Sequence, residues 1–233
     1  MSTETKRTGE EMIESAKRAE LRQKINQKKE LPHVIVFGAS NSGKTSVTDY
    51  LENALDYKNL PPFGFFKRYL EHHYELPEFA LDTLEGKQIT PFGAKTNMDK
   101  WMVDFYHFIE EHDPYFTSRN LRKFLDTDWK MRFDMLCAGE PKFYFPIAFH
   151  GVRWNYELDV IFEKYHEYCQ KVLCIVLSGR GESKSSDHLL KELVDRCIQE
   201  KDDNPKNFSV VNISNTGTKH DLYYKVLLAI HNY

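Results

Sequence analysis

The sequence predicts an α/β protein in which a mostly parallel β-sheet is covered by helices on both faces. After residue 30, short β-branched or aromatic runs alternate with longer segments of helical character. A glycine-rich turn joins the first of these runs to the first helical segment. With 233 residues, of which 41% are hydrophobic, the chain is long enough for one large domain with a substantial core.

Residues 1–30 differ in composition from the rest, and we treat them as a charged N-terminal extension of a domain that spans 31–233. They are polar and mixed in sign. A thin apolar stripe is formed by Met12, Ile13, Ala16, Ala19 and Ile25. Two interpretations stay open for this extension: a solvated or partly disordered segment, or a helix that becomes ordered on a partner.

The helices and strands of the domain are predicted from apolar runs and from the glycines and prolines that end them. The first strand is expected at His33–Phe37 and the first helix at Lys44–Leu55. Residues 56–100 are rich in aromatics and prolines. They predict a loop-like insertion at about 56–90, with one short helix near Phe65–His72. Further strands are predicted at Trp101–Phe108, Phe143–Phe149, Val172–Ser178 and Phe208–Ser214. Further helices are predicted at Ser118–Phe124, Trp154–Cys169, Ser186–Gln199 and Lys219–His231.

Residues 38–45, Gly-Ala-Ser-Asn-Ser-Gly-Lys-Thr, match the pattern GxxxxGK[ST] in full. Two glycines let successive backbone N–H groups converge on phosphate oxygens, and the following helix adds its unpaired N–H groups. Lys44 is expected to reach the β- and γ-phosphates, and the Thr45 hydroxyl to bind Mg²⁺. The predicted phosphate-binding residues are Gly38, Ala39, Ser40, Asn41, Ser42, Gly43, Lys44, Thr45 and Ser46.

Composition and charge limit the partners and the cellular locations that we expect for this protein. A net charge of −3 gives no global attraction to nucleic acid or to an anionic membrane. The sequence has no run of about 18 apolar residues, so we expect no membrane span. Four cysteines lack CxxC spacing, and we expect reduced thiols, with Cys174 in a buried strand. The N-terminus lacks the apolar core of a secretory signal, and its glutamates are unusual for a mitochondrial presequence, although a removed presequence stays an alternative.

The loop Gly-Ala-Ser-Asn-Ser-Gly-Lys-Thr-Ser closely resembles the GxSNxGKSS loop of the EngB (YihA) family of translation-factor-class GTPases, and Leu31-Pro32 also fits that family. Residues 90–106 look like its switch-I stretch, a PGxTQ motif followed by a strand. This resemblance implies a three-layer P-loop NTPase fold of the Ras-like GTPase kind. It further implies GTP or GDP as the nucleotide, with ATP as an alternative, and Thr45 and Thr96 as Mg²⁺ ligands.

Two further motifs of the EngB family are not matched in full by this sequence. Where the family has DxPGYG, this chain has Pro146-Ile147-Ala148-Phe149-His150-Gly151, without the aspartate. The base-recognition motif TKxD has no clear counterpart. Residues 210–217 align with the final strand and loop, which leaves one strand–helix unit missing; a competing alignment uses residues 218–221, a literal TKxD. The resemblance therefore predicts a pseudo-GTPase with negligible hydrolysis.

The same resemblance supplies the expectations for ions, partners and location. Asn41 either holds a potassium ion beside the phosphates or serves as a left-handed turn residue. The expected partner is a ribosomal subunit or assembly intermediate, through rRNA and ribosomal proteins. The expected location is the mitochondrial matrix, with the cytoplasm as the alternative. The compact basic cluster at 118–123 and the basic residues of the extension are the expected rRNA contacts.

Two rival functions remain. A P-loop kinase of a nucleotide or small metabolite would use Asp104 as the carboxylate beside Mg²⁺. Its phosphate clamp would come from Arg119, Arg122, Lys123 and Arg180. A purely structural subunit would use the aromatics between Phe63 and Tyr74 as an interface, although such residues also build cores. His72 and His73 lack the partners of a zinc site.

Overall fold

The computed structural model describes residues 9–28, 30–91, 93–137, 146–168, 170–180 and 187–233. In chain order, its elements are α1 (Gly9–Asn26), β1 (His33–Gly38), α2 (Lys44–Leu55), β2 (Lys58–Leu60), α3 (Phe63–Tyr74), α4 (Glu78–Asp82), α5 (Leu84–Gln88), α6 (Met98–His112), α7 (Phe116–Cys137), β3 (Ile147–His150), α8 (Asn155–Glu167), β4 (Val172–Ser178), α9 (Asp187–Asp203), β5 (Phe208–Ser214) and α10 (Lys219–Asn232). They form two compact units. We call residues 1–59, 144–150 and 165–233 the sheet unit, and residues 60–143 and 151–164 the helical unit.

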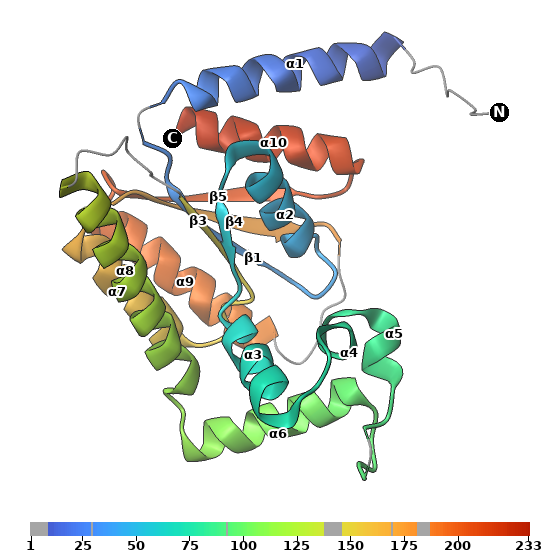
Figure 1. Cartoon of the computed structure of the whole chain (residues 1–233). Helices are drawn as coiled ribbons and strands as arrows, with labels where there is room; N and C mark the ends of the chain where they lie inside the picture. The colour runs from blue at the N-terminus through green and yellow to red at the C-terminus, as the bar shows by residue number, and fades with distance from the viewer. Residues whose placement is uncertain (1–8, 29, 92, 138–145, 169, 181–186) are drawn as a thin grey trace. The chain divides into compact units, whose positions relative to one another are not determined.

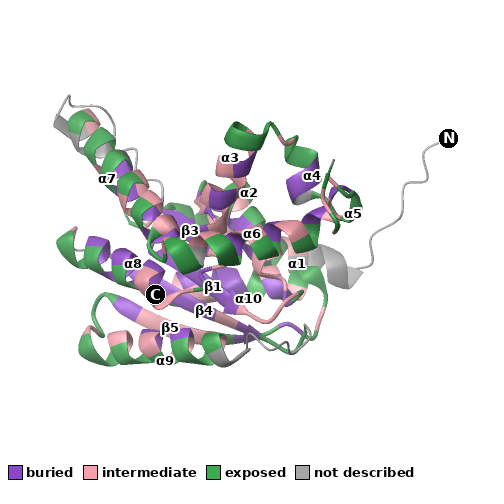
Figure 2. Cartoon of the chain, turned by 90° about the horizontal axis from the view of Figure 1, so that it is seen from below, coloured by how far each residue is buried: buried purple, intermediate pink, exposed green. Residues whose placement is uncertain are grey.

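The sheet has five strands in the order β2-β3-β1-β4-β5. The pairs β1–β3, β1–β4 and β4–β5 are parallel, with Val36 opposite His150 in one pair and Gly38 opposite Leu177 in another. The two central strands β1 and β4 are buried along most of their length (Figure 2). Continuous apolar runs such as these are typical of a parallel sheet that is covered on both faces.

Helices of the sheet unit cover both faces of the sheet (Figure 1). On one face, α2 packs against β1, α10 packs against β5 and α2, and α1 packs against α10. On the other face, α9 packs against β5 and β1. The first face encloses a core that includes Val34, Leu51, Ile175, Val226 and Ile230. The α/β fold with a mostly parallel sheet is therefore confirmed.

Helix α1 belongs to this core through its last two turns. Leu21 and Ile25 are buried there, with 8% and 0% of their surface exposed. Toward its exposed side, Lys24 pairs with Glu20 one turn earlier, at 2.7 Å. Of the stripe seen in the sequence, Ile25 is buried in this core, while Ala16 and Ala19 are exposed.

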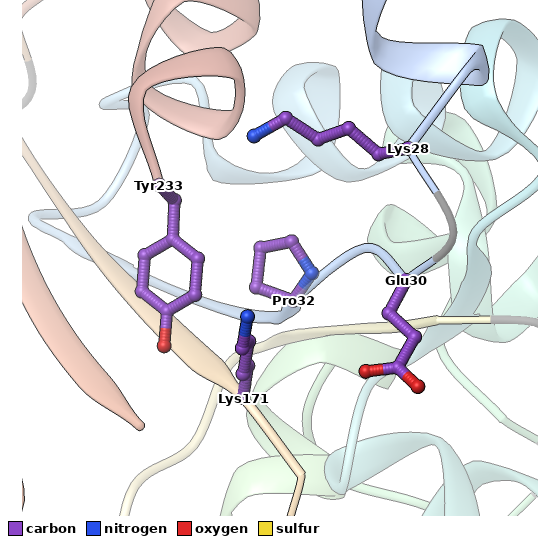
Figure 3. A pocket seen from close by; sticks show the side chains of 5 residues that line it. All are labelled: Lys28, Glu30, Pro32, Lys171 and Tyr233. Carbon is purple, nitrogen blue, oxygen red and sulfur yellow. The ribbon is translucent and has the colours of Figure 1, made fainter. Parts of the chain in front are cut away.

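The segment between α1 and β1 lies against the end of α10. Lys28 Nζ donates to the carbonyl oxygens of Ile230 and His231, at 3.2 and 2.7 Å, which satisfies part of the end of that helix. Burial, together with the charge of Lys171, lowers the pKa of Lys28. An open cavity of about 400 Å³ at this corner is lined by Lys28, Glu30, Pro32, Lys171 and Tyr233 (Figure 3).

The helical unit is built from α3 to α7 and the first part of α8. Its core is aromatic and contains Phe66, Leu70, Met102 and Tyr106. The short helix predicted near Phe65–His72 is confirmed as α3. The insertion as a whole is less loop-like than expected, because α4 and α5 follow α3 directly.

One predicted strand is wrong. Residues 101–108 lie within helix α6, and the buried residues Met98, Met102 and Tyr106 of that helix recur every four residues. That spacing places them on one helical face against Phe66 and Leu70. The aromatic and β-branched content of the segment favoured a strand, but its burial follows the helical period.

Most other predictions hold. The strands at 172–178 and 208–214 and the helix at 44–55 have the predicted bounds. The predicted strand at 143–149 is described only as β3, because residues 143–145 lie outside the described residues. Helix α7 is much longer than the predicted 118–124. Helices α8, α9 and α10 occupy the predicted segments, while Cys169 and Ser186 lie outside the described residues.

Within the part of the chain that the structure describes, no helix has both the length and the apolar character of a membrane span. Cys174 lies in a buried strand, as predicted, and its thiol is free, as is that of buried Cys197. Burial raises the pKa of the Cys174 thiol, and the neighbouring Cys197 raises it further.

Candidate functional site: a phosphate-binding loop

The loop between β1 and α2 has the backbone geometry that a phosphate cradle requires. Gly43, the residue before α2, has a φ of 101°, and Asn41 has a φ of 62°, so both lie in left-handed conformations. Such conformations turn successive N–H groups toward one side of the loop. Asn41 thus acts as the turn residue that the sequence allowed, and its role in holding potassium stays a prediction.

Both motif glycines are also needed for space. A Cβ on Gly43 would lie 2.9 Å from the side-chain nitrogen of Asn215 and 3.3 Å from Leu222. A Cβ on Gly38 would overlap the Ser42 hydroxyl oxygen and lie 3.1 Å from Leu177. These neighbours come from β4, the β5–α10 loop and α10, so the sheet unit is packed closely around the loop.

Lys44 lies in the first turn of α2, and its Nζ donates to the carbonyl oxygens of Gly38 and Ala39, at 2.7 and 2.6 Å. The ammonium is therefore held over the loop by the backbone of the loop itself. From that position a small rotation of the side chain would exchange carbonyl oxygens for phosphate oxygens. The structure thus places the predicted phosphate-binding lysine on the loop.

The loop is tied to the last strand of the sheet by Asn215. Its Nδ2 donates to the carbonyl oxygen of Ser42 at 2.7 Å, and its backbone N donates to Ser178 at 2.7 Å. Ser42 and Asn215 are both buried. Asn215 therefore joins the phosphate loop, through its side chain, to the end of β4, through its backbone.

We expect Asn215→Ala to lower the free energy of unfolding by about 1–3 kcal/mol, because it leaves the buried Ser42 carbonyl without its donor. Nucleotide affinity should fall several-fold, since the loop loses the hydrogen bond that fixes the Ser42 carbonyl. Chemical denaturation and calorimetric titration measure the two effects. Asn212→Ala, which removes an exposed amide from the same strand, is the matched control. Unchanged stability and affinity in Asn215→Ala would show that the tie is dispensable.

The residue next to the loop at the end of β3 is His150. Its Nδ1 lies 3.1 Å from the hydroxyl of Thr48 in α2 and 3.1 Å from Oδ1 of Asn59. Among the described residues of the sheet unit, strands β1, β3, β4 and β5 end in Gly38, His150, Ser178 and Ser214, none of them a carboxylate. The described residues also contain no cluster of three or more metal-binding side chains. No carboxylate therefore ends these four strands, and the alignment with the EngB motifs stays a prediction.

A magnesium ion bound with a nucleotide would find one protein ligand at the loop. Thr45 is exposed in the first turn of α2, directly after Lys44. Magnesium commonly takes its remaining ligands from phosphates and water, so this arrangement fits a loosely held ion. Thr96, the other predicted ligand, lies in the helical unit just before α6, and its role stays a prediction.

The literal TKxD sequence at 218–221 is a helix cap. Thr218 is the N-cap of α10, its hydroxyl accepts from the Asp221 backbone, and the Asp221 carboxylate accepts from Thr218 N at 2.6 Å. These bonds hold the pKa of Asp221 below its ordinary value. Asp221 therefore caps a helix, and residues 208–214 form β5, while the choice between the two alignments stays a prediction.

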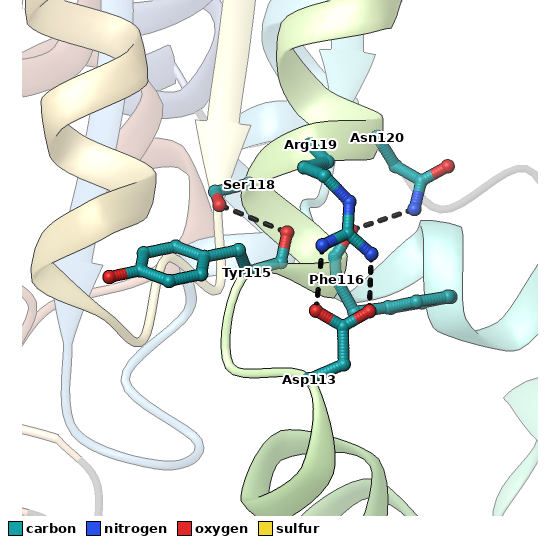
Figure 4. A network of polar contacts seen from close by, with 6 residues as sticks. All are labelled: Asp113, Tyr115, Phe116, Ser118, Arg119 and Asn120. Atoms are coloured by element: carbon teal, nitrogen blue, oxygen red, sulfur yellow. Dashed lines mark hydrogen bonds and ion pairs between the residues drawn. The ribbon is translucent and has the colours of Figure 1, made fainter.

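The cationic residues proposed as a phosphate clamp are paired within their own units. In the helical unit, Arg119 forms a two-bond ion pair with Asp113, one bond of 2.8 Å (Figure 4), and Arg122 pairs likewise with Glu163. Lys123 is exposed. In the sheet unit, Arg180 donates to the Gly217 carbonyl at 2.5 Å.

Asp104 does not lie at a strand end. It is exposed on helix α6, where it pairs with Lys100 at 2.9 and 3.0 Å. The interpretation of Asp104 as the magnesium-shell carboxylate of a kinase is therefore wrong in its structural premise. An exposed pair one helical turn apart contributes little to stability.

The loop and the strand order together define a P-loop nucleotide-binding fold, in which β3 and β4 flank the strand that leads into the loop. No protein-family model matches the chain, and no curated protein is significantly similar to it. Similar solved structures include a gluconokinase from Sinorhizobium meliloti 1021, with 12% identity, a TM-score of 0.39 and coverage of 88% of this chain and 94% of that chain. A dephospho-CoA kinase from Campylobacter jejuni has 14% identity, a TM-score of 0.38 and coverage of 85% and 96%. Similarities this distant assign neither a family nor an activity.

Proposed function

We propose that this protein binds a nucleoside triphosphate on the loop at 38–45 and transfers its γ-phosphoryl group to a small acceptor, as a P-loop kinase does. The observation that carries this proposal is the phosphate loop itself, in which Asn41 and Gly43 are left-handed and the Lys44 ammonium lies on the loop carbonyls. A loop of this kind holds the triphosphate of a nucleotide. Residues 60–143 and 151–164 form a compact unit of their own, which a GTPase switch does not require.

The structure after Thr96 does not fit the switch region of a GTPase. The EngB-like interpretation requires a strand directly after Thr96, and that stretch is helix α6. The proposal of a ribosomal partner in the mitochondrial matrix therefore rests on the sequence of the phosphate loop alone. A kinase explains both the loop and the inserted helices, so we prefer it.

The roles of the residues follow from the geometry. The loop N–H groups hold the β-phosphate, while Lys44 neutralises charge that develops on the transferred group. Thr45 would hold a bound magnesium ion, which would neutralise charge on the phosphates. Since the Asp221 carboxylate is occupied as a helix cap, a guanine-selective aspartate is missing from this segment. We therefore expect ATP to bind at least as tightly as GTP.

The test is a transfer assay with γ-labelled ATP or GTP, magnesium and a panel of sugars, nucleosides and nucleoside monophosphates. We expect one acceptor class to accelerate nucleotide turnover at least tenfold over water, with label recovered on the acceptor. Turnover with water alone should be negligible, because no carboxylate ends the described strands of the sheet. Lys44→Ala must abolish the transfer.

Two outcomes would contradict the kinase proposal. Tight nucleotide binding without transfer to any acceptor would indicate a binding module. Lys44-dependent hydrolysis at the rate of an active GTPase, unaffected by acceptors, would favour the GTPase interpretation.

A further inference from the structure

A second cationic site lies on the sheet unit, between helices α1 and α10. A cavity of about 110 Å³ is lined there by Lys17, Arg18, His220, Asp221 and Tyr224. Its volume equals roughly that of three to four waters in the liquid, taken as ~30 Å³ each. That is room for one tetrahedral anion and too little for a nucleoside.

The feature that points to a ligand is Arg18. Among the described residues, its Nη1 atom is buried and has no hydrogen-bond partner. A buried guanidinium donor without an acceptor is unfavourable, because it has lost water without gaining a replacement. An acceptor in the cavity would remove this cost.

No hydrogen bond joins Arg18 Nη1 to the described residues that line the cavity. The Asp221 carboxylate oxygen Oδ2 is engaged by the backbone N and hydroxyl of Thr218, at 2.6 and 2.9 Å. Lys17 adds a second permanent positive charge, and Asp221 carries the negative charge of the lining. Together, Lys17, Arg18 and Asp221 leave one net positive charge among the described lining residues, in a chain whose net charge is −3.

We propose that this cavity binds a phosphate group, either free phosphate or the phosphoryl end of a small phosphorylated metabolite. Arg18 provides the fixed donor, Lys17 contributes positive charge at the rim, and the His220 ring and the Tyr224 hydroxyl can donate. A guanidinium suits a tetrahedral oxyanion because it presents several N–H donors in one plane. This site is distinct from the phosphate loop, and the proposal does not depend on the kinase activity.

The experiment is a titration of inorganic phosphate, and separately of glycerol phosphate, followed by calorimetry and ³¹P NMR. The protein carries Lys44→Ala so that the phosphate loop does not contribute. We expect saturable binding that Arg18→Met weakens at least tenfold, the scale of one charge-assisted contact. Arg22→Met, on the same helix but outside this cavity, should leave binding within twofold. Tighter binding of glycerol phosphate than of phosphate would identify a metabolite as the source, and the reverse would identify free phosphate.

A structural role for Arg18 predicts different results. If Arg18 only supports α1, Arg18→Met lowers the melting temperature of the ligand-free protein. We expect instead no loss, because the change removes a buried donor that has no acceptor. Phosphate binding that is unchanged in Arg18→Met would overturn the proposal. So would binding that chloride and sulfate reproduce equally and only at high millimolar concentration.

Discussion

Replacing Lys44 by alanine is expected to lower the affinity for nucleoside triphosphates at least tenfold. In the structure its ammonium lies on the loop, bonded to the carbonyl oxygens of Gly38 and Ala39. The substitution removes the side-chain cation of residues 38–45 that can bind the phosphates. A charge-assisted contact of this kind contributes roughly 1.5–3 kcal/mol to binding. Calorimetric titration with ATP and GTP, with and without magnesium, measures the loss.

Lys24→Ala is the matched control, because it removes an exposed lysine of the same unit whose partner is Glu20. The fold of Lys44→Ala should be intact, since the lysine side chain contributes little to the core. Equal nucleotide affinity in the wild-type protein and in Lys44→Ala would refute a functional phosphate loop, and the kinase proposal would fall with it.

A larger effect on stability is expected from Gly43→Ala. The new Cβ would lie 2.9 Å from the Asn215 side chain in a residue whose φ is 101°. A left-handed alanine costs roughly 1–2 kcal/mol, and overpacking adds about 1–3 kcal/mol. We therefore expect the free energy of unfolding to fall by about 2–5 kcal/mol, together with the loss of measurable nucleotide binding. Denaturant unfolding and calorimetry measure the two quantities.

Gly93→Ala separates the two causes of this loss. Gly93 also has a left-handed φ, of 79°, but a Cβ there would meet no atom within 4 Å. Gly93→Ala should therefore lower the free energy of unfolding only through its left-handed backbone conformation, by about 1–2 kcal/mol. If Gly43→Ala lowers the free energy of unfolding no more than Gly93→Ala does, the Asn215 side chain does not pack closely against Gly43 in solution.

The elements around the phosphate loop were predictable because their signals are local. A buried β-branched run, a glycine-rich turn and a helix with the buried positions Val47, Leu51 and Leu55 follow each other within one short stretch. Helix α6 was not predicted, since its aromatic residues favour a strand by propensity. Only the four-residue recurrence of Met98, Met102 and Tyr106 indicated the helix.

Two residues of the site could not be found from the sequence. Asn215 contacts Ser42 across 173 residues of chain, so no local pattern links them. His150 gained its place beside α2 through the pairing of β3 with β1. The position of His150 was readable as the end of a strand, but its partners Thr48 and Asn59 depend on strand order. Contacts of this kind depend on topology, which sequence periodicity does not specify.

The packing of α1 on α10 has a consequence for how the chain reaches its native state. Lys28 bonds to the carbonyl of His231, 203 positions away in sequence. Contacts this distant form late, because closing long loops costs entropy before any burial repays it. During synthesis, the apolar face of α1 with Leu21 and Ile25 therefore emerges long before its partner helix exists. The growing chain must carry this exposed surface until its last helix is made, and a chaperone that shields early apolar segments is expected to raise the yield of folded protein.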